Sequence, residues 1–486
     1  MRLTYLAYTF SLAMMYFSIV LLFPIIVAVI YGETNAVLPF IVAASSAFLI
    51  GVTLRKLVKG ASQITSVNDI KKGEGLCIVF FCWVFAGLFA SIPYLFFDLT
   101  PINALFEAVS GITTTGATIL TNFDYPKTLF FWRSFTQWLG GMGIIVLFIA
   151  ILPQFAIAGR QLFFAEAPGP TEDKITPRIK NTAASLWKIY FGMTVLAYIL
   201  LKINGVENFE AVCHALSSVS GGGFSPNSNS LIGSSKSVIW ILTFFMFFAG
   251  ASYNLQYRAW SKFNPFVLFK NEEFRTYFTV FISFALLLGL SLFIHSNYDI
   301  SASLAHSFFQ VSSIISSSGF CSVDFASWDY TSKTILFVAM LAGGCASSAG
   351  GGIKIVRWLL VLKIVRAELA KILHPKAVYN IKIGKYSVNK DILYQTLMFV
   401  FFYLAILVIS ALVVAVIEQN TVVGITGAVA SVGNIGPAFG KLGPLSNYSD
   451  LHSVSKCIFM IDMFIGRLEL IPFLVLFQRD LWTIRT

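Results

Sequence analysis

Four short turns in this sequence carry residues suited to binding a bare cation. The turns are Thr113–Gly116, Ser220–Gly223, Ser316–Gly319 and Gly433–Gly436, and each ends in a glycine. Glycine adopts positive φ angles without steric cost, so its backbone can expose carbonyl oxygens that other residues would hide. Carbonyl and hydroxyl oxygens can replace the water shell of a cation. We therefore interpret these turns as a candidate cation site.

The candidate ligands are three residues in each turn, ending at its glycine. They are Thr114, Thr115, Gly116, Gly221, Gly222, Gly223, Ser317, Ser318, Gly319, Asn434, Ile435 and Gly436. No lysine or arginine occurs in the four turns, which argues against an anion site. A single turn of this kind is usually a surface loop. Four turns in phase with the hydrophobic pattern make that alternative improbable.

The residues before each glycine repeat with the same spacing. Small residues predominate eight and six positions earlier, as in Ala108 and Ser110 before Gly116. This spacing predicts a short helix packed tightly against a neighbour before each turn. The glycines are 107, 96 and 117 residues apart. The pattern predicts four copies of a unit made of span, short helix, turn and span.

The elements that hold these turns are apolar enough to cross a membrane. Among the 486 residues, 57% are hydrophobic and 12% are charged, about half the charged fraction of a soluble domain. Runs of about 20 apolar residues recur, the length that crosses a bilayer core. We predict ten spans, near residues 6–30, 36–54, 76–97, 129–152, 183–203, 237–257, 277–296, 332–365, 391–417 and 453–478.

This pattern predicts an all-α integral membrane protein with four membrane–pore–membrane repeats and two additional N-terminal helices. The expected units are residues 1–72, 73–155, 156–260, 261–372 and 373–486, and residues 153–182 form a linker. The net charge of +11 comes from lysines and arginines concentrated in alternate loops. The positive-inside rule explains that distribution better than nucleic-acid binding. It predicts a cytoplasmic N-terminus.

Irregular backbone does not survive in hydrocarbon unless it is buried in protein or lines a water-filled cavity. Four half-spanning turns therefore need a shared polar interior, and four repeats around one axis supply it. The short helices would also point their partly negative C-terminal ends at that axis, which favours a cation. The residues thus predict a cation pore.

Two further features could control such a pore. The candidates are Gly343, Gly344, Gly350, Gly351, Gly352, Lys354 and Arg467. Three consecutive glycines cannot hold a regular helix, so the span should break there, either as a mobile gate or as a packing kink. Arg467 lies in the last span, either as an electrostatic barrier in the ion path or paired with Asp462 or Glu469. Asp324, after the third turn, could concentrate cations or cap a loop.

The sequence resembles the Trk/Ktr family of bacterial potassium uptake proteins, in particular its TrkH-type membrane subunits. The similarity runs through the whole chain. It is carried by TTTGAT at 113–118, FWRSFTQWLGGMGIIVLFIAILP at 131–153, GGCASSAGGGIK at 343–354 and GRLE at 466–469. Two positions depart from the family pattern: Gly221, where relatives often have a bulkier residue, and Ala438, where a glycine is expected.

The resemblance implies K⁺ as the transported ion, with Gly343–Lys354 and Arg467 as the gate. It also implies a homodimer in the bacterial inner membrane, docked on a cytosolic ring of nucleotide-binding RCK/KTN subunits that holds the nucleotide. An alternative is a secondary transporter that couples K⁺ entry to Na⁺ or H⁺; such proteins tend to have inverted repeats, whereas these four share one orientation. An enzyme would need a convergent catalytic constellation, and the sequence offers none. We expect no partner beyond these and the membrane lipids.

Overall fold

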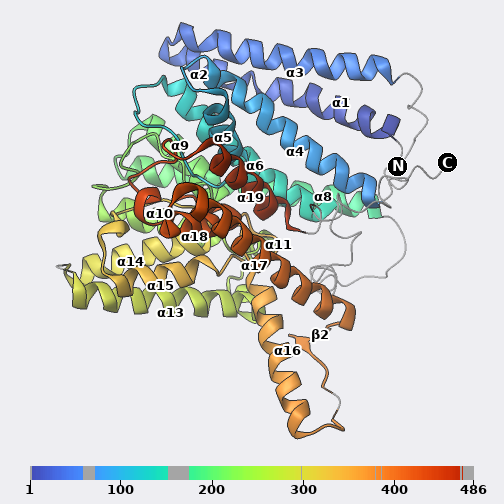
Figure 1. Cartoon of the computed structure of the whole chain (residues 1–486), viewed down its shortest axis with the longest axis vertical. Helices are drawn as coiled ribbons and strands as arrows, with labels where there is room; N and C mark the ends of the chain where they lie inside the picture. The colour runs from blue at the N-terminus through green and yellow to red at the C-terminus, as the bar shows by residue number, and fades with distance from the viewer. Residues whose placement is uncertain are drawn as a thin grey trace.

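The computed structural model describes residues 3–58, 72–150, 175–296, 298–377, 379–384, 386–470 and 473. The chain begins with α1 (Leu3–Val20), α2 (Phe23–Tyr31), the 3₁₀ turn η1 (Thr34–Ala36) and α3 (Val37–Leu57). Helix α1 packs along α3, and both pack on α4 (Figure 1). Pro24 lies in the first turn of α2, where its missing N–H leaves no bond unmade.

Four units of similar construction follow this N-terminal layer. The first contains α4 (Lys72–Leu95), α5 (Pro101–Ile112) and α6 (Lys127–Ala150). The second contains α8 (Ile175–Ile203), α9 (Asn208–Ser220), α10 (Lys236–Ala249), α11 (Tyr253–Ser261) and α12 (Phe266–Lys270). The third contains α13 (Glu272–His295), α14 (Ile300–Ile315), η5 (Phe325–Ser327), α15 (Tyr330–Met340) and α16 (Ile355–Leu373). The fourth contains α17 (Lys390–Glu418), α18 (Thr421–Val432), η6 (Gly440–Leu442) and α19 (Ser453–Leu468).

The order of helices agrees with the predicted unit of span, short helix, turn and span. The short helices α5, α9, α14 and α18 each pack against the long helix that precedes them. Their inward faces are buried, so they form the centre of the molecule and not its surface. The sequence therefore predicted the all-α membrane architecture correctly.

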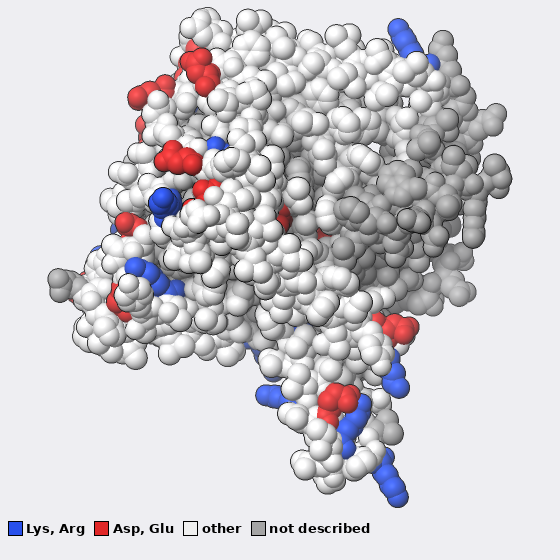
Figure 2. Space-filling view, in the orientation of Figure 1, with Lys and Arg blue, Asp and Glu red and all other residues white. Residues whose placement is uncertain are grey.

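Six helices are long and apolar enough to cross a membrane unaided, within the ranges described above. Between 28% and 39% of the residues in their apolar stretches are buried inside the protein, so most of each stretch faces outward. On the face in Figure 2, charged side chains lie along one edge, at the upper right near the end of α3, and on the projecting part of α16. The surface between them is nearly uncharged, as a membrane-facing surface requires.

Two predicted spans are not single straight helices. The predicted break in 332–365 is present, because α15 ends at Met340 and α16 begins at Ile355. The predicted span over 237–257 is bent, because α10 and α11 meet at an angle of 104°. The Gly250 carbonyl at this bend accepts a hydrogen bond from the Cys345 N–H (2.8 Å), so a distant segment occupies the break.

Helix α16 projects from the body of the molecule (Figure 1). It is followed by a small antiparallel hairpin, β1 (Lys382–Ile383) and β2 (Tyr386–Ser387), in which Ile383 pairs with Tyr386. Most of the predicted linker 153–182 lies outside the described residues. Its last part is helical, because α8 begins at Ile175.

Candidate functional site

The four turns share one backbone conformation. The glycines have φ angles of 80° (Gly116), 75° (Gly223), 80° (Gly319) and 92° (Gly436). The residues two positions earlier are also left-handed, with φ of 55° at Thr114, 66° at Gly221, 56° at Ser317 and 52° at Asn434. Three of these four are not glycines, and such residues rarely adopt this conformation. The same pair of left-handed residues in each turn indicates one structure built four times.

A common helix cap produces this conformation. In each turn the backbone N–H of the residue before the glycine donates to the carbonyl of the residue five positions before that donor. The pairs are Thr115 to Ser110 (2.9 Å), Gly222 to Ser217 (2.9 Å), Ser318 to Ser313 (2.7 Å) and Ile435 to Ala430 (2.8 Å). This pattern, closed by a left-handed residue, is the Schellman type of helix end. The small residues that accept these bonds are fully buried, as the predicted tight packing requires.

Each of the four glycines lies against the turn of the next unit, so the four turns form one closed ring. A Cβ atom added to Gly116 would lie 2.3 Å from the carbonyl oxygen of Gly222. The corresponding distances are 1.8 Å from Gly223 to Ser318, 2.1 Å from Gly319 to Ile435 and 2.4 Å from Gly436 to Thr115. Each glycine therefore faces the carbonyl that precedes the glycine of the next unit, and the fourth faces the first. No other amino acid fits these four positions without displacing backbone.

A cavity of about 60 Å³ lies at one end of this ring, and all four glycines line it. A second, smaller hollow lies among Gly350, Gly351, Gly352, Lys354 and Arg467. The first is large enough for water molecules. The four glycines among the predicted ligands therefore line one hollow, and five of the predicted gate residues line the other.

The side chains of the ring are less symmetric than its backbone. In the first turn the hydroxyls of Thr113 and Thr115 lie 2.8 Å apart, and in the third those of Ser316 and Ser318 lie 2.9 Å apart. The second and fourth turns have Gly222 and Ile435 in place of the second hydroxyl residue. The first and third units lie opposite each other in the ring. Around the ring, turns that have a pair of hydroxyl groups therefore alternate with turns that lack such a pair.

The Gly343–Lys354 segment lies against the third and fourth turns. The Gly351 N–H donates to the Ser317 hydroxyl (2.6 Å). A Cβ on Gly350 would lie 2.7 Å from the Ser316 carbonyl, and one on Gly351 would lie 2.5 Å from that of Gly433. The segment is closed on itself by bonds from Gly343 N–H to the Ile353 carbonyl and from Ile355 N–H to the Gly344 carbonyl (both 3.0 Å).

Two buried, positively charged side chains hold this segment in place. Lys354 donates to the Gly350 carbonyl and to the Ser348 hydroxyl (3.2 Å). Arg467 donates to the carbonyl of Ala349 and to that of Gly140 on α6 (2.8 Å). Arg467 thus connects the Gly343–Lys354 segment to the first unit.

The alternative pairing of Arg467 with a nearby carboxylate is wrong. Glu469 instead accepts from Arg357 (2.7 Å), and Asp462 accepts from the Ser410 hydroxyl (2.8 Å). The guanidinium of Arg467 is bonded to backbone carbonyls, which leave its positive charge uncompensated. Asp324 caps η5 by accepting from the Ala326 N–H (3.0 Å), the second of the two roles expected for it.

Sequence reasoning missed the side chains that support the turns. Arg133 and Gln137 on α6, Glu107 on α5 and Tyr448 before α19 all bond to residues in or beside the turns. A signal for two of them was present, since a glutamate and an arginine within apolar segments usually have a specific role. The departure at Gly221 also has an explanation: the same position is filled by Thr114, Ser317 and Asn434 elsewhere, so glycine is permitted there but not required.

Known proteins resemble this chain over nearly its whole length. The family model for TrkH, described as a cation transport protein, matches residues 44–483. The Trk system potassium uptake protein TrkH of Halomonas elongata is 34% identical, over 97% of this chain and 98% of its own length. The TrkH protein of Escherichia coli K12 is 33% identical with the same coverage.

A solved structure is also similar. The crystal structure of the potassium transporter TrkH from Vibrio parahaemolyticus superposes with a TM-score of 0.90 at 29% sequence identity, covering 99% of this chain and 100% of the other. These relatives are named as uptake proteins and a transporter, in agreement with the expectation that the chain is not an enzyme.

Proposed function

Because this chain belongs to the TrkH family of cation transport proteins, we propose that it takes up K⁺ through a gated pore whose narrow part is the ring of four turns. The observation that carries the proposal is the closed contact of each glycine with the carbonyl of the next unit. A ring of backbone oxygens between two hollows is the arrangement that replaces the water shell of a passing cation.

The proposed K⁺ ligands are the twelve residues named from the sequence, Thr114–Gly116, Gly221–Gly223, Ser317–Gly319 and Asn434–Gly436. Their shared left-handed pattern supports an equal contribution of backbone oxygen from each unit. Only one glycine per turn is common to all four, so the site is short. A short site with few coordination steps is expected to pass K⁺ and Rb⁺ better than Na⁺, with moderate discrimination.

The proposed gate is the Gly343–Lys354 segment together with Arg467. Its contacts with Ser317 and with the backbone of the third and fourth turns support a closed position directly against the ring. Lys354 and Arg467 add two buried positive charges beside the smaller hollow. Positive charge there opposes cation entry. Opening would require the bonds from Arg467 to Ala349 and from Gly351 to Ser317 to break.

The proposed regulator is a cytosolic ring of nucleotide-binding RCK/KTN subunits that binds a homodimer of this chain. Helix α16 supports a mechanical route, because it begins directly after the Gly343–Lys354 segment and projects away from the body (Figure 1). The Ile355 N–H is bonded to Gly344, so a partner that displaces α16 also pulls on the gate. The N-terminus would lie on the same cytoplasmic side.

The unit boundaries given from the sequence remain our proposed division of the chain into an N-terminal pair and four repeats. A secondary transporter that couples K⁺ to Na⁺ or H⁺ remains the second candidate. A pore lets K⁺ flow down its gradient when no Na⁺ or H⁺ gradient exists, whereas a coupled carrier requires the second ion.

The deciding experiment has two stages. The chain is expressed in a bacterium that lacks K⁺ uptake systems, and growth is measured at low external K⁺. Wild type should restore growth, and Gly116→Ser, Gly223→Ser, Gly319→Ser and Gly436→Ser should not. Gly205→Ser is the matched control, because Gly205 also has a positive φ (85°) but nothing lies within 4 Å of an added Cβ.

In the second stage, purified protein in liposomes is tested for ⁸⁶Rb⁺ uptake with and without Na⁺ and pH gradients. Uptake without either gradient supports the pore. Failure of the wild type both to restore growth and to pass ⁸⁶Rb⁺ would overturn the proposed function.

A further inference from the structure

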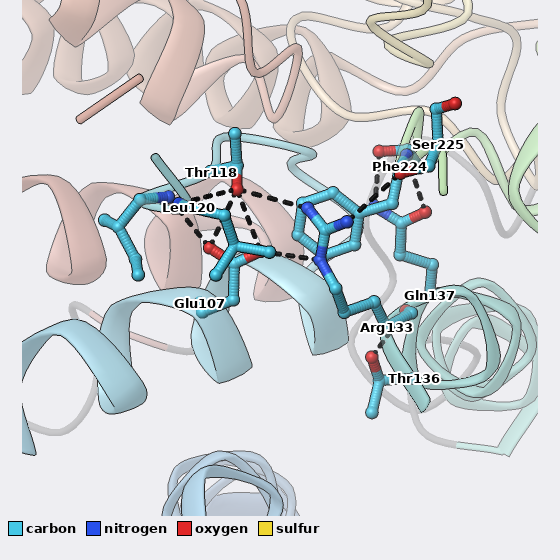
Figure 3. A network of polar contacts seen from close by, with 10 residues as sticks. Glu107, Thr118, Leu120, Arg133, Thr136, Gln137, Phe224 and Ser225 are labelled. Atoms are coloured by element: carbon cyan, nitrogen blue, oxygen red, sulfur yellow. Dashed lines mark hydrogen bonds and ion pairs between the residues drawn. The ribbon is translucent and has the colours of Figure 1, made fainter. Parts of the chain in front are cut away.

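Arg133 lies outside the ring but bonds to two of its turns at once. It is on α6, and only 2% of its surface is exposed. Its Nη2 donates to the Thr118 hydroxyl (3.1 Å), and its Nη1 donates to the Ser225 carbonyl (3.1 Å). Thr118 and Ser225 each lie two residues after the glycine of their turn. Arg133 therefore joins equivalent positions of the first and second units (Figure 3).

The buried carboxylate of Glu107 bonds to Arg133 on the side of the first turn, and we call these two residues the brace. Glu107 on α5 is fully buried and accepts from Arg133 Nε (2.8 Å). The same carboxylate accepts from the Thr118 hydroxyl (3.0 Å) and from the Ile119 N–H (2.9 Å). Bonds that involve an ionised partner are about twice as strong as neutral ones. The chain after Gly116 is thus fixed at both side chain and backbone.

The side of the second turn is held by α6 as well. Gln137, one helical turn after Arg133, donates to the Gly222 carbonyl (2.5 Å) and accepts from the Phe224 N–H (3.0 Å). The Arg133 guanidinium carbon lies 4.1 Å from the centre of the Phe224 ring. A Cβ atom added to Gly222 would lie 2.4 Å from the Gln137 side chain, so only glycine leaves room for Gln137 at this position.

Two neighbouring turns of the ring meet at a joint, and the contacts at the joints away from Arg133 are weaker. The second and third turns are joined by the Leu231 N–H and the Cys321 carbonyl (3.1 Å), and the fourth and first by the Tyr448 N–H and the Thr118 carbonyl (2.8 Å). These are neutral bonds, as is the bond from the Asn434 side-chain amide to the Thr115 hydroxyl between the fourth and first turns (3.0 Å). The residue nine positions before each ring glycine also differs between the units. In the first and second units it is Glu107 and His214, whose side chains bond to the residue two positions after the glycine. In the fourth unit it is Gly427, which has no side chain.

From this arrangement we infer that Arg133 is a positioning residue that sets the spacing of the first and second turns, and through it the discrimination between K⁺ and Na⁺. The inference rests on the proposed function. Arg133 lines the cavity beside the ring together with the four glycines, and its three hydrogen bonds all go to protein atoms. Its effect passes through Thr118 and Ser225, which fix where the carbonyls of the adjoining turns lie.

Arg133 bonds to no described residue of the Gly343–Lys354 segment, although its helix α6 also carries Gly140, whose carbonyl accepts from Arg467 (2.8 Å). The Gly343–Lys354 segment contacts the third and fourth turns at their other end, around Ser316 and Gly433. Loss of the brace should therefore alter which ion passes without altering whether the gate is closed. A residue with a merely structural role would lower the amount of folded protein and leave the ion preference of the remainder unchanged.

The test measures the K⁺/Na⁺ permeability ratio of purified protein in liposomes. The main variant is the double change Glu107→Gln/Arg133→Gln, which removes both buried charges together and leaves the net charge unaltered. We expect the ratio to fall by about tenfold, the factor that corresponds to 1.4 kcal/mol. Arg133→Lys keeps the charge but cannot reach three partners, and should give an intermediate ratio.

The matched control is Lys127→Gln/Glu207→Gln. This pair also starts from α6 (3.1 Å), but its side chains are 40% and 61% exposed, and the ratio should not change. An unaltered ratio in the double variant, or in Arg133→Lys if the double variant does not fold, overturns the inference and leaves the proposed function intact. A wild type that neither restores growth at low K⁺ nor passes either ion overturns the proposed function instead.

Discussion

The side-chain amide of Asn434 donates to the hydroxyl of Thr115 (3.0 Å), so the fourth turn is bonded to its neighbour in the ring, the first turn. The same amide donates to the Met463 carbonyl on α19 (2.9 Å). Asn434 also has a positive φ of 52°, a conformation that asparagine tolerates better than most residues. One side chain therefore holds its own turn, the neighbouring turn and the last helix together.

Replacing Asn434 with alanine or glycine should separate these roles. Asn434→Gly removes both bonds but keeps the left-handed backbone free of strain. Asn434→Ala removes the bonds and adds about 1–2 kcal/mol of strain at this φ. We expect both to lower the K⁺/Na⁺ permeability ratio in liposomes, and only Asn434→Ala to lower the melting temperature further. Equal melting temperatures would contradict the strain argument.

The second prediction concerns the closest contact of the ring. In Gly223→Ala the new Cβ would lie 1.8 Å from the Ser318 carbonyl oxygen, far inside contact distance. The backbone must move, so we expect ⁸⁶Rb⁺ uptake to be lost. Gly205→Ala carries the same strain of about 1–2 kcal/mol for a left-handed residue without the collision. Retained uptake in Gly223→Ala would show that the ring is not the ion path.

Removal of the Arg467 charge should open the pore without a partner. Arg467→Gln weakens the bonds to Ala349 and Gly140 and deletes a buried positive charge. Hydrogen bonds to charged groups contribute about 1.5–3 kcal/mol, so we expect basal ⁸⁶Rb⁺ flux to rise by about tenfold or more. Lys371→Gln, an exposed change on α16, should leave it unaltered. Unchanged flux in folded Arg467→Gln protein would remove Arg467 from the proposed gate.

Stability should depend on burial of an ion pair more than on its presence. Glu107→Gln leaves the Arg133 charge buried without its counter-ion, a change that typically costs about 3–5 kcal/mol. Glu207→Gln breaks an exposed pair worth about 0–1 kcal/mol. Thermal unfolding in detergent should therefore show a large fall in melting temperature for the first variant only. Similar melting temperatures would mean that the Glu107 site admits water.

The sequence predicted the helices and the four turns because both depend on local patterns. Apolar length defines the spans, and the spacing of small residues before Gly116, Gly223, Gly319 and Gly436 defines the short helices. The break at Gly343–Lys354 was also local, since consecutive glycines cannot continue a helix. The gate role of this segment, in contrast, was expected mainly from the family resemblance, because a broken helix alone has other causes.

Features that depend on distant contacts could not be predicted. The bend after Ala249 accommodates the Gly343–Lys354 segment, about a hundred residues later, whose Cys345 and Ala349 N–H groups bond to Gly250 and Ala249. The positive φ at Thr114 and Ser317 follows from the helix caps, and neither residue type indicates it. The brace at Arg133 joins two units, and no spacing within either one reveals it.

The closed ring of glycines has a consequence for how this protein is made. Gly436 faces Thr115, so the last contact joins a residue near the end of the chain to one in the first quarter. Synthesis proceeds from the N-terminus, and the first three units are complete before Gly436 exists. A partly synthesised chain therefore cannot close the ring, and the four turns enclose a common axis only after the fourth unit has been made.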